Sequence, residues 1–289
     1  MSFSLKRFRR YPAKELATNT GIVGSIMAKL YSAVDVRGSL SNIIADPWTA
    51  IRCVVRLPCI YSVGSPPKVS VIIATRNNEK TIECAIKSLV NQDYRNIEMI
   101  IVDDASDDGS LQIIRSFAKT DERIKILTNK QRLGIGESRN TGLRVATGKY
   151  ITFQDGDDYS LPSRISCQVQ AFRNETIKLC LCNYVRINDS GEVLELNDRR
   201  VMKCIISMMF PREDIIDAVG YFRRTSIGED SEYYERIKRK FGKSSEKVIF
   251  RTLYKAKFNE NSSFFSNTVV TQLTSNKIKF EPTNKAVRH

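Results

Sequence analysis

From Val69 onward, short apolar runs alternate with segments whose apolar residues recur at helical spacing. Runs rich in Val, Ile and aromatic residues predict strands at 69–75, 96–104, 123–129 and 149–153. Helical spacing between them predicts helices at 81–92, 110–120 and 136–148. Because strand and helix alternate at intervals of roughly 25 residues, the sequence predicts an α/β fold. Its central sheet should be mostly parallel, with helices on both faces.

The two ends of the chain differ from this middle region in charge. Residues 1–68 carry 10 Lys/Arg against 3 Asp/Glu and residues 232–289 carry 13 against 5, whereas the region between them is nearly neutral. The linker-like SVGSPPK ends this first region, and a helix is expected within 14–33. We therefore predict an N-terminal basic extension and linker over 1–67, a folded domain over 68–263 and a basic C-terminal tail over 264–289.

The basic ends favour acidic partners. LKRFRR (5–10) and RIKRK (236–240) could bind an anionic membrane surface or an acidic polysaccharide, and solvated charge without a partner is the alternative. No nucleic-acid partner is expected, because aromatic stacking motifs are lacking. The sequence shows no transmembrane run and no signal-peptide core, and its seven irregularly spaced cysteines suit reduced thiols. These features predict a cytoplasmic protein that can associate with the inner face of the membrane.

Polar side chains gather where the predicted strands end. They form three groups: Thr75-Arg76, Asp103-Asp104 and Asp155-Gly156-Asp157-Asp158. The carboxyl ends of parallel strands meet at one edge of the sheet, where open α/β sheets bind their ligands. An Asx turn or a helix cap is the alternative interpretation of Asp103 and Asp104.

The DGDD turn at 155–158 places three carboxylates close together. They repel one another, so the turn is either solvated or built to hold a cation. Hard oxygen ligands without a nearby His or Cys suit Mg²⁺ or Mn²⁺. The calcium-loop alternative fails, because no Glu follows at the required spacing.

Charged groups also occupy the starts of two predicted helices. Gly134 and Gly136 precede the helix that carries Arg139 in its first turns, an arrangement that suits phosphate. Glu229 and Asp230 follow Gly228 at the start of a later helical segment. Acidic residues favour a helix N-terminus through its dipole, so the pair need not be catalytic.

Three stretches, in this order, resemble a family 2 inverting glycosyltransferase of GT-A (nucleotide-diphospho-sugar transferase) fold. They are VSVIIATRNNEKTIECAIKSLVNQDYRNIEMIIVDDASDDGS, GIGESRNTGLRVATGKYITFQDGDD and GYFRRTSIGEDSEYYERI. The resemblance runs from Val69 to Ile237 and more loosely to Ser263. It implies metal-dependent transfer of a sugar from a UDP-sugar to a glycan or lipid-linked acceptor, in bacterial surface polysaccharide biosynthesis.

The resemblance also implies roles for individual residues. The residues that would bind the nucleotide sugar are Thr75, Arg76, Glu79, Asp104, Arg139 and Asp155. Asp104 would recognise the uracil base. Asp157 and Asp155 would hold the metal, and Asp158 would assist them or lie beneath the site. Asp230 would be the base that takes the proton of the acceptor hydroxyl, and Glu229 is the second choice.

The sequence departs from the family at one position of the expected site. LYKAKFNENSSF (253–264) has Lys257 where the family often has a histidine, and the only histidine is His289. A lysine could neutralise the diphosphate, but it cannot ligate a metal while protonated. The QxxRW motif of processive synthases is missing, which favours a non-processive transferase. Alternatives are a catalytically silent nucleotide- or glycan-binding module and a nucleotidyltransferase, whose glycine-rich first loop is not found.

Overall fold

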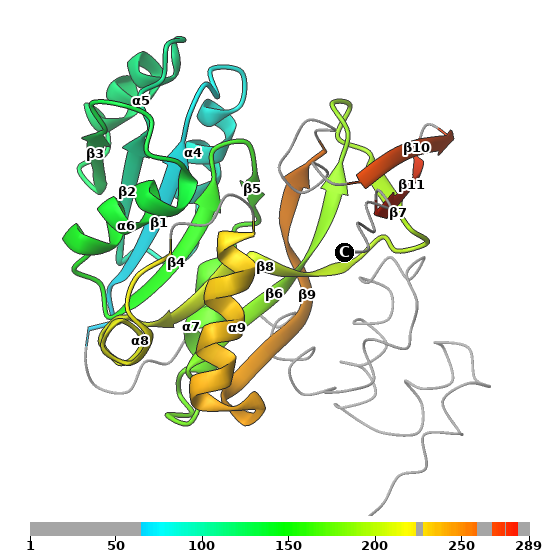
Figure 1. The fold of residues 1–289 in the computed structure, drawn as a ribbon. Helices are drawn as coiled ribbons and strands as arrows, with labels where there is room; N and C mark the ends of the chain where they lie inside the picture. The colour runs from blue at the N-terminus through cyan, green and yellow to red at the C-terminus, as the bar shows by residue number, and fades with distance from the viewer. Residues whose placement is uncertain (1–64, 224–227, 259–267, 275, 283–289) are drawn as a thin grey trace, which may run out of the picture. The chain divides into compact units, whose positions relative to one another are not determined.

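The computed structural model describes residues 65–223, 228–258, 268–274 and 276–282, all within one unit, Val63–His289 (Figure 1). The helices in the described residues are α4 (Ile82–Val90), α5 (Ser110–Ala118), α6 (Ile135–Val145), α7 (Arg164–Ala171), α8 (Arg212–Val219), α9 (Glu229–Phe241) and the 3-10 helix η3 (Lys243–Ser245). The strands are β1 (Val69–Thr75), β2 (Ile97–Asp103), β3 (Ile124–Thr128), β4 (Tyr150–Asp155), β5 (Tyr159–Ser160), β6 (Leu179–Ile187), β7 (Val193–Leu196), β8 (Met202–Pro211), β9 (Glu246–Lys257), β10 (Thr268–Thr274) and β11 (Lys277–Pro282). Residues 1–64, with the helix expected within 14–33, lie outside the described residues.

Four parallel strands in the order β4-β1-β2-β3 form the part of the sheet that the sequence predicted. Every residue of β1 and β2 is buried, as expected for parallel strands that are covered on both faces. The apolar positions that predicted the first helix, Ile82, Ala85, Ile86 and Leu89, are the buried face of α4. The predicted α/β alternation is therefore confirmed.

Alternating side chains of β4 show why helices cover both faces of the sheet. Phe153 packs edge-on against Phe222, with ring centroids 5.3 Å apart, in the core cluster shared with α6 and α9. Its neighbour Gln154 points to the opposite face and donates a hydrogen bond of 3.0 Å to the backbone oxygen of Ala85 in α4. One strand thus joins two helical layers, because successive side chains leave it in opposite directions.

Beyond β4 the sheet continues through strands that the sequence did not predict. β8 pairs antiparallel with both β4 and β6, and β9 runs parallel beside β6 (Figure 1). β7, β11 and β10 extend this half further. The last two strands fall in the predicted basic tail, where lysines alternate with apolar residues such as Ile278, which packs on Leu194 and Leu196. The predicted domain limits at 67/68 and 263/264 stay predictions.

The described residues also bear on the cysteine and membrane predictions. Among the described residues, Cys84, Cys167, Cys180, Cys182 and Cys204 form no disulfide bond with one another. The other two cysteines lie outside the described residues. None of the described helices is long and apolar enough to span a bilayer.

Glu98 of β2 is a buried carboxylate that joins neighbouring segments. It accepts hydrogen bonds from Ser70 Oγ (2.6 Å), Thr147 N (2.7 Å) and Lys125 Nζ (2.8 Å), and it pairs with Lys68 at 3.0 Å. Burial alone would raise its pKa, but these donors outweigh burial, and the pKa of Glu98 lies well below its usual value. The carboxylate therefore stabilises the folded state only while it is ionised.

We expect Glu98→Gln to lower the free energy of unfolding by about 2 kcal/mol near pH 7, because Ser70, Thr147 and Lys125 lose a charged hydrogen-bond acceptor. The wild-type contribution is complete above the unfolded-state pKa of about 4.3 and is lost as the pH falls below it. The difference between the two proteins should therefore shrink in acid, which urea denaturation near pH 7 and near pH 3 would measure. Glu122→Gln, at an exposed position, is the control. Equal stabilities of wild type and Glu98→Gln near pH 7 would contradict this role.

Candidate functional site

The DGDD turn lies directly beside the end of β1. Ala74 of β1 is in register with Asp155 of β4, so the turn begins where β1 ends. A Cβ atom on Gly156 would come within 2.5 Å of Thr75 Oγ1 and of Asn78 Nδ2. Only a glycine allows this approach, which brings the turn against the polar residues that follow β1.

The three aspartates of the turn form a compact cluster. One carboxylate oxygen from each of Asp155, Asp157 and Asp158 lies within 4.8 Å of the other two. Burial, and then the charge of Asp155, raise the pKa of Asp157 to about 6. Burial and both neighbouring carboxylates also raise the pKa of Asp158. A divalent cation would relieve this repulsion, and the all-oxygen ligand set fits Mg²⁺ or Mn²⁺.

Asp158 is held in place from β9. Its two oxygens accept hydrogen bonds from the Tyr254 hydroxyl (2.8 Å) and from the backbone N–H of Lys257 (2.9 Å). The Tyr254 hydroxyl in turn accepts the backbone N–H of Asp155 at 3.2 Å. Asp158 therefore lies beneath the site and fixes the turn, so Asp155 and Asp157 are the residues of the turn that could hold a metal.

Arg139 connects the DGDD turn to the start of α9. Its guanidinium donates to Asp155 Oδ1 and to Glu229 Oε1, both at 2.8 Å. It lies 5.7 Å from the ring centroids of Phe153 and Phe222, and its side chain is 3% exposed. Burial opposes the charged form, but Asp155, Glu229 and Asp230 outweigh it and raise the pKa of Arg139. A buried, permanently charged group thus fixes the two acidic segments at one place.

The second acidic segment forms the first turn of α9, as the sequence predicted. Gly228, with φ 74°, stands immediately before the helix, and Glu229 and Asp230 open it. Glu229 is engaged by Arg139, whereas Asp230 accepts the N–H of the neighbouring Ser231 at 2.7 Å. Of the two carboxylates, Asp230 is therefore the one more available to a substrate proton.

Asp104 organises the loop that leads into α6. Its oxygens accept hydrogen bonds from Asn129 Nδ2 and from the backbone N–H groups of Leu133 and Gly134, each at 2.8 Å. Burial opposes ionisation, but these donors outweigh it and lower the pKa of Asp104. Asp104 is 4% exposed, so only a small part of it faces the edge where a base would bind.

The residues that follow β1 are fastened to the loop that follows β2. Arg76 Nε donates to the Ala105 oxygen at 3.5 Å, and Glu79 accepts the backbone N–H of Gly109 at 3.2 Å. Thr75 is buried at the end of β1 and faces the DGDD turn. The structure thus brings Thr75 and Arg76 to the predicted edge, whereas Glu79 braces two loops against each other.

Two side chains at this edge, Tyr254 and Arg186, had no role in the prediction, and Asp103 was expected only as a member of the polar group Asp103-Asp104. Asp103 has a buried oxygen, Oδ1, without a hydrogen-bond partner in the described residues. Tyr254 supports Asp158, and the charge of Arg186 acts on Asp157. The roles of Tyr254 and Arg186 depend on long-range strand pairing and leave no local signal.

The basic segment RIKRK is partly committed to contacts within the molecule. Arg236 pairs with Glu232 at 2.8 Å, and Lys238 pairs with Glu246 at 3.6 Å. Arg239 and Lys240 remain exposed. The segment therefore offers an anionic surface fewer charges than its sequence suggests, and LKRFRR lies outside the described residues.

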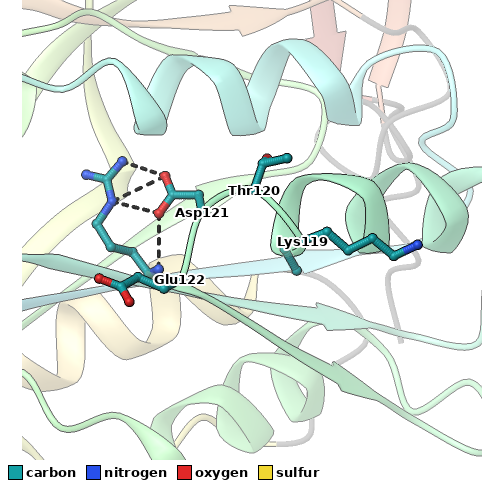
Figure 2. Close-up of a pocket in the computed structure, with 6 residues that line it drawn as sticks. Lys119, Thr120, Asp121 and Glu122 are labelled. Carbon is teal, nitrogen blue, oxygen red and sulfur yellow. Dashed lines mark hydrogen bonds and ion pairs between the residues drawn. The ribbon is translucent and has the colours of Figure 1, made fainter.

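A separate pocket lies near the amino ends of the parallel strands, away from the acidic cluster at their carboxyl ends. It is lined by residues 118–123, where α5 ends and β3 begins, and Figure 2 shows the ion pair between Arg123 and Asp121 within it. The amino ends of parallel strands are not where open α/β sheets bind their ligands. The acidic cluster at the carboxyl ends is the better candidate for the functional site.

Comparisons with known proteins identify the family and the fold of the chain. The profile of Glycosyl transferase family 2 matches residues 70–228, more than half of the chain. The crystal structure of S. aureus TarS 1–349 in complex with UDP-GlcNAc is similar with a TM-score of 0.58 and 25% identity, over 70% of this chain and 62% of that one. This likeness confirms the predicted GT-A fold.

Two named relatives are similar over part of the chain. One is the UDP-Glc:alpha-D-GlcNAc-diphosphoundecaprenol beta-1,3-glucosyltransferase WfgD of Escherichia coli, 35% identical over 43% of this chain and 49% of its own length. The other is the GalNAc(5)-diNAcBac-PP-undecaprenol beta-1,3-glucosyltransferase of Campylobacter jejuni, 39% identical over 36% of this chain and 34% of its own length. The match thus spans half or less of these relatives.

Proposed function

The chain belongs to Glycosyl transferase family 2, and from this premise we propose that it is a metal-dependent, inverting glycosyltransferase. Its donor is a UDP-sugar, and its acceptor is a hydroxyl group of a glycan or of a lipid-linked glycan. The UDP-GlcNAc complex of TarS and the lipid-linked acceptors in the names of the relatives support this choice. The proposed setting is surface polysaccharide assembly in the cytoplasm, at the inner face of the membrane.

The observation that carries the proposal is the link that Arg139 makes between Asp155 and Glu229. It places the DGDD and GED carboxylates, which are far apart in the sequence, at one edge of the sheet. Inverting transfer needs charge stabilisation for the departing diphosphate and a base for the acceptor hydroxyl. The DGDD carboxylates would hold the cation that stabilises the diphosphate, and the GED carboxylates would supply the base beside it.

In the proposed reaction, the acceptor oxygen forms a bond to the anomeric carbon of the sugar while the bond from that carbon to the diphosphate breaks. Asp230 takes the proton of the acceptor hydroxyl, and Glu229 orients the acceptor. Asp157 and Asp155 would hold Mn²⁺ or Mg²⁺, which stabilises negative charge on the diphosphate when bound. Lys257 adds a positive charge on the same side of the site.

The nucleoside occupies the ends of β1 and β2 in this proposal. Thr75 and Arg76 contact the nucleoside. Asp104 accepts a hydrogen bond from the base and also holds the loop before α6. Glu79 supports this pocket through its bond to Gly109. Arg139 positions the carboxylates of the site, in place of the direct nucleotide contact that the resemblance implied.

Hydrolysis of a panel of nucleotide sugars tests the proposal. We expect slow release of UDP from one UDP-sugar in the presence of Mn²⁺, loss of that release with a chelator, and a reduction of at least about 100-fold in Asp157→Ala. Asp214→Ala, at a surface ion pair of α8, is the control and should retain the wild-type rate. Nucleotide-sugar binding without turnover on any acceptor would favour the silent binding module. Failure to bind any nucleotide sugar would overturn the enzyme proposal.

A further inference from the structure

Two positive charges approach the DGDD turn from neighbouring strands. β6 and β9 run side by side (Figure 1). Their pairing is parallel, with Ile187 in register with Lys257. Arg186, the residue before Ile187, donates from Nη1 to the backbone oxygen of Lys257 at 3.3 Å. The backbone N–H of Lys257 in turn donates to Asp158 Oδ1 at 2.9 Å. Hydrogen bonds therefore join both residues to the turn whose carboxylates are expected to hold the metal.

Lys257 can exchange its present partner for a phosphate. Its ammonium pairs with Asp189 at 2.8 Å, and the Asp189 side chain is 87% exposed. Ion pairs of this exposed kind contribute little free energy, so a doubly charged diphosphate can replace the carboxylate. Lys257 is also fixed at its backbone, where its N–H binds Asp158. The backbone of Lys257 is thus fixed beside the turn, whereas its ammonium group is held only by a weak ion pair.

Arg186 differs because it is buried. The residue is 6% exposed, and its guanidinium lies 5.8 Å from the centroid of the Tyr184 ring. A charge in such surroundings is screened little by solvent or salt and acts on its neighbours more strongly than a surface charge. A guanidinium also remains charged at every working pH. The pair thus joins one fixed and one movable cation on the same side of the acidic turn.

We propose, on the basis of the proposed function, that Arg186 and Lys257 bind the diphosphate of the donor by charge, so that the site retains UDP after the divalent metal is removed. The metal-ligating histidine expected near the diphosphate is replaced here by Lys257. The two cations then supply part of the charge that such a site otherwise takes from its metal. Metal would still be needed for turnover, because the departing diphosphate gains charge as its bond breaks.

Calorimetric titration of UDP and of uridine, each with chelator and with Mn²⁺, tests this proposal. With chelator, wild type is expected to bind UDP at least about tenfold more tightly than uridine, since charge-assisted bonds to phosphate are strong. Arg186→Gln and Lys257→Met should each remove most of that preference, and Arg186→Lys should keep much of it. Lys277→Met, which removes a strand lysine paired with Asp198 far along the sheet, should bind like wild type.

The difference in affinity between UDP and uridine shows whether the metal or the two cations bind the diphosphate. If wild type prefers UDP only when Mn²⁺ is present, the metal supplies the whole charge and the inference is wrong, while the proposed function stands. If Arg186→Gln and Lys257→Met keep the wild-type preference with chelator, the two cations do not bind the diphosphate. If UDP binds under neither condition, the proposed function fails together with this inference.

Discussion

Asp230→Asn is expected to lower kcat by about 10³-fold and to leave the dissociation constant for UDP nearly unchanged. The loss follows from the role of a general base, which typically contributes between about 10² and 10⁴ in rate. Asparagine keeps the size of the side chain and can still accept the N–H of Ser231, so the start of α9 should persist. The change removes only the ability to take the acceptor proton. Steady-state kinetics with a saturating acceptor and UDP titration would measure the two effects.

Two companion variants make this result specific. Glu235→Gln lies on the same helix, 59% exposed, and should retain the wild-type kcat. Glu229→Gln should lose less than Asp230→Asn if Glu229 only orients the acceptor. A kcat for Asp230→Asn within tenfold of wild type, with a larger loss in Glu229→Gln, would transfer the role of base to Glu229.

Arg139→Met should cause the largest combined loss of stability and activity. It leaves Asp155 and Glu229 close together without their shared cation, and truncating one partner of a buried ion pair typically costs about 3–5 kcal/mol. The two acidic segments should then separate, and transfer should fall by at least about 100-fold, since small displacements of catalytic groups are costly. Chemical denaturation and kinetics of the same samples would show both effects.

Arg139→Lys tests whether the charge at position 139 is sufficient or whether the geometry of the guanidinium is also needed. A lysine keeps the positive charge but cannot present two parallel N–H groups to two carboxylates. We expect it to recover most of the stability and little of the activity. Arg144→Met, which removes an arginine of the same helix whose side chain is 50% exposed, should change stability by less than about 0.5 kcal/mol. Wild-type turnover in Arg139→Lys would show that the geometry of the link is unimportant.

The parts of the molecule that the sequence predicted well depend on local signals. β1 begins and ends at the residues expected, because VSVIIAT is apolar throughout and is followed by Thr75-Arg76 and a loop. α9 starts at Glu229, as expected from a glycine followed by two acidic residues. The gathering of polar residues at one edge followed from the parallel order of the strands, which the alternation of elements implied.

Contacts between distant segments could not be predicted in the same way. The sequence did not predict that Arg139 pairs with Asp155 and Glu229, which lie 16 and 90 positions away in the chain. Asp158 finds Tyr254 across 96 positions, through the pairing of β9 with β5 and β6. No composition or periodicity marks such partners, because they depend on the order of the strands beyond β4. The same strand order places Arg186 of β6 beside Lys257 of β9.

Anomalous scattering from crystals grown with UDP and Mn²⁺ would locate the metal and the nucleotide in one experiment. We expect a manganese peak beside the Asp157 carboxylate and the diphosphate, with the uracil at the ends of β1 and β2 and Asp230 facing the opposite side of the site. A manganese peak away from Asp155 and Asp157, or a nucleotide bound at the pocket lined by residues 118–123, would contradict it.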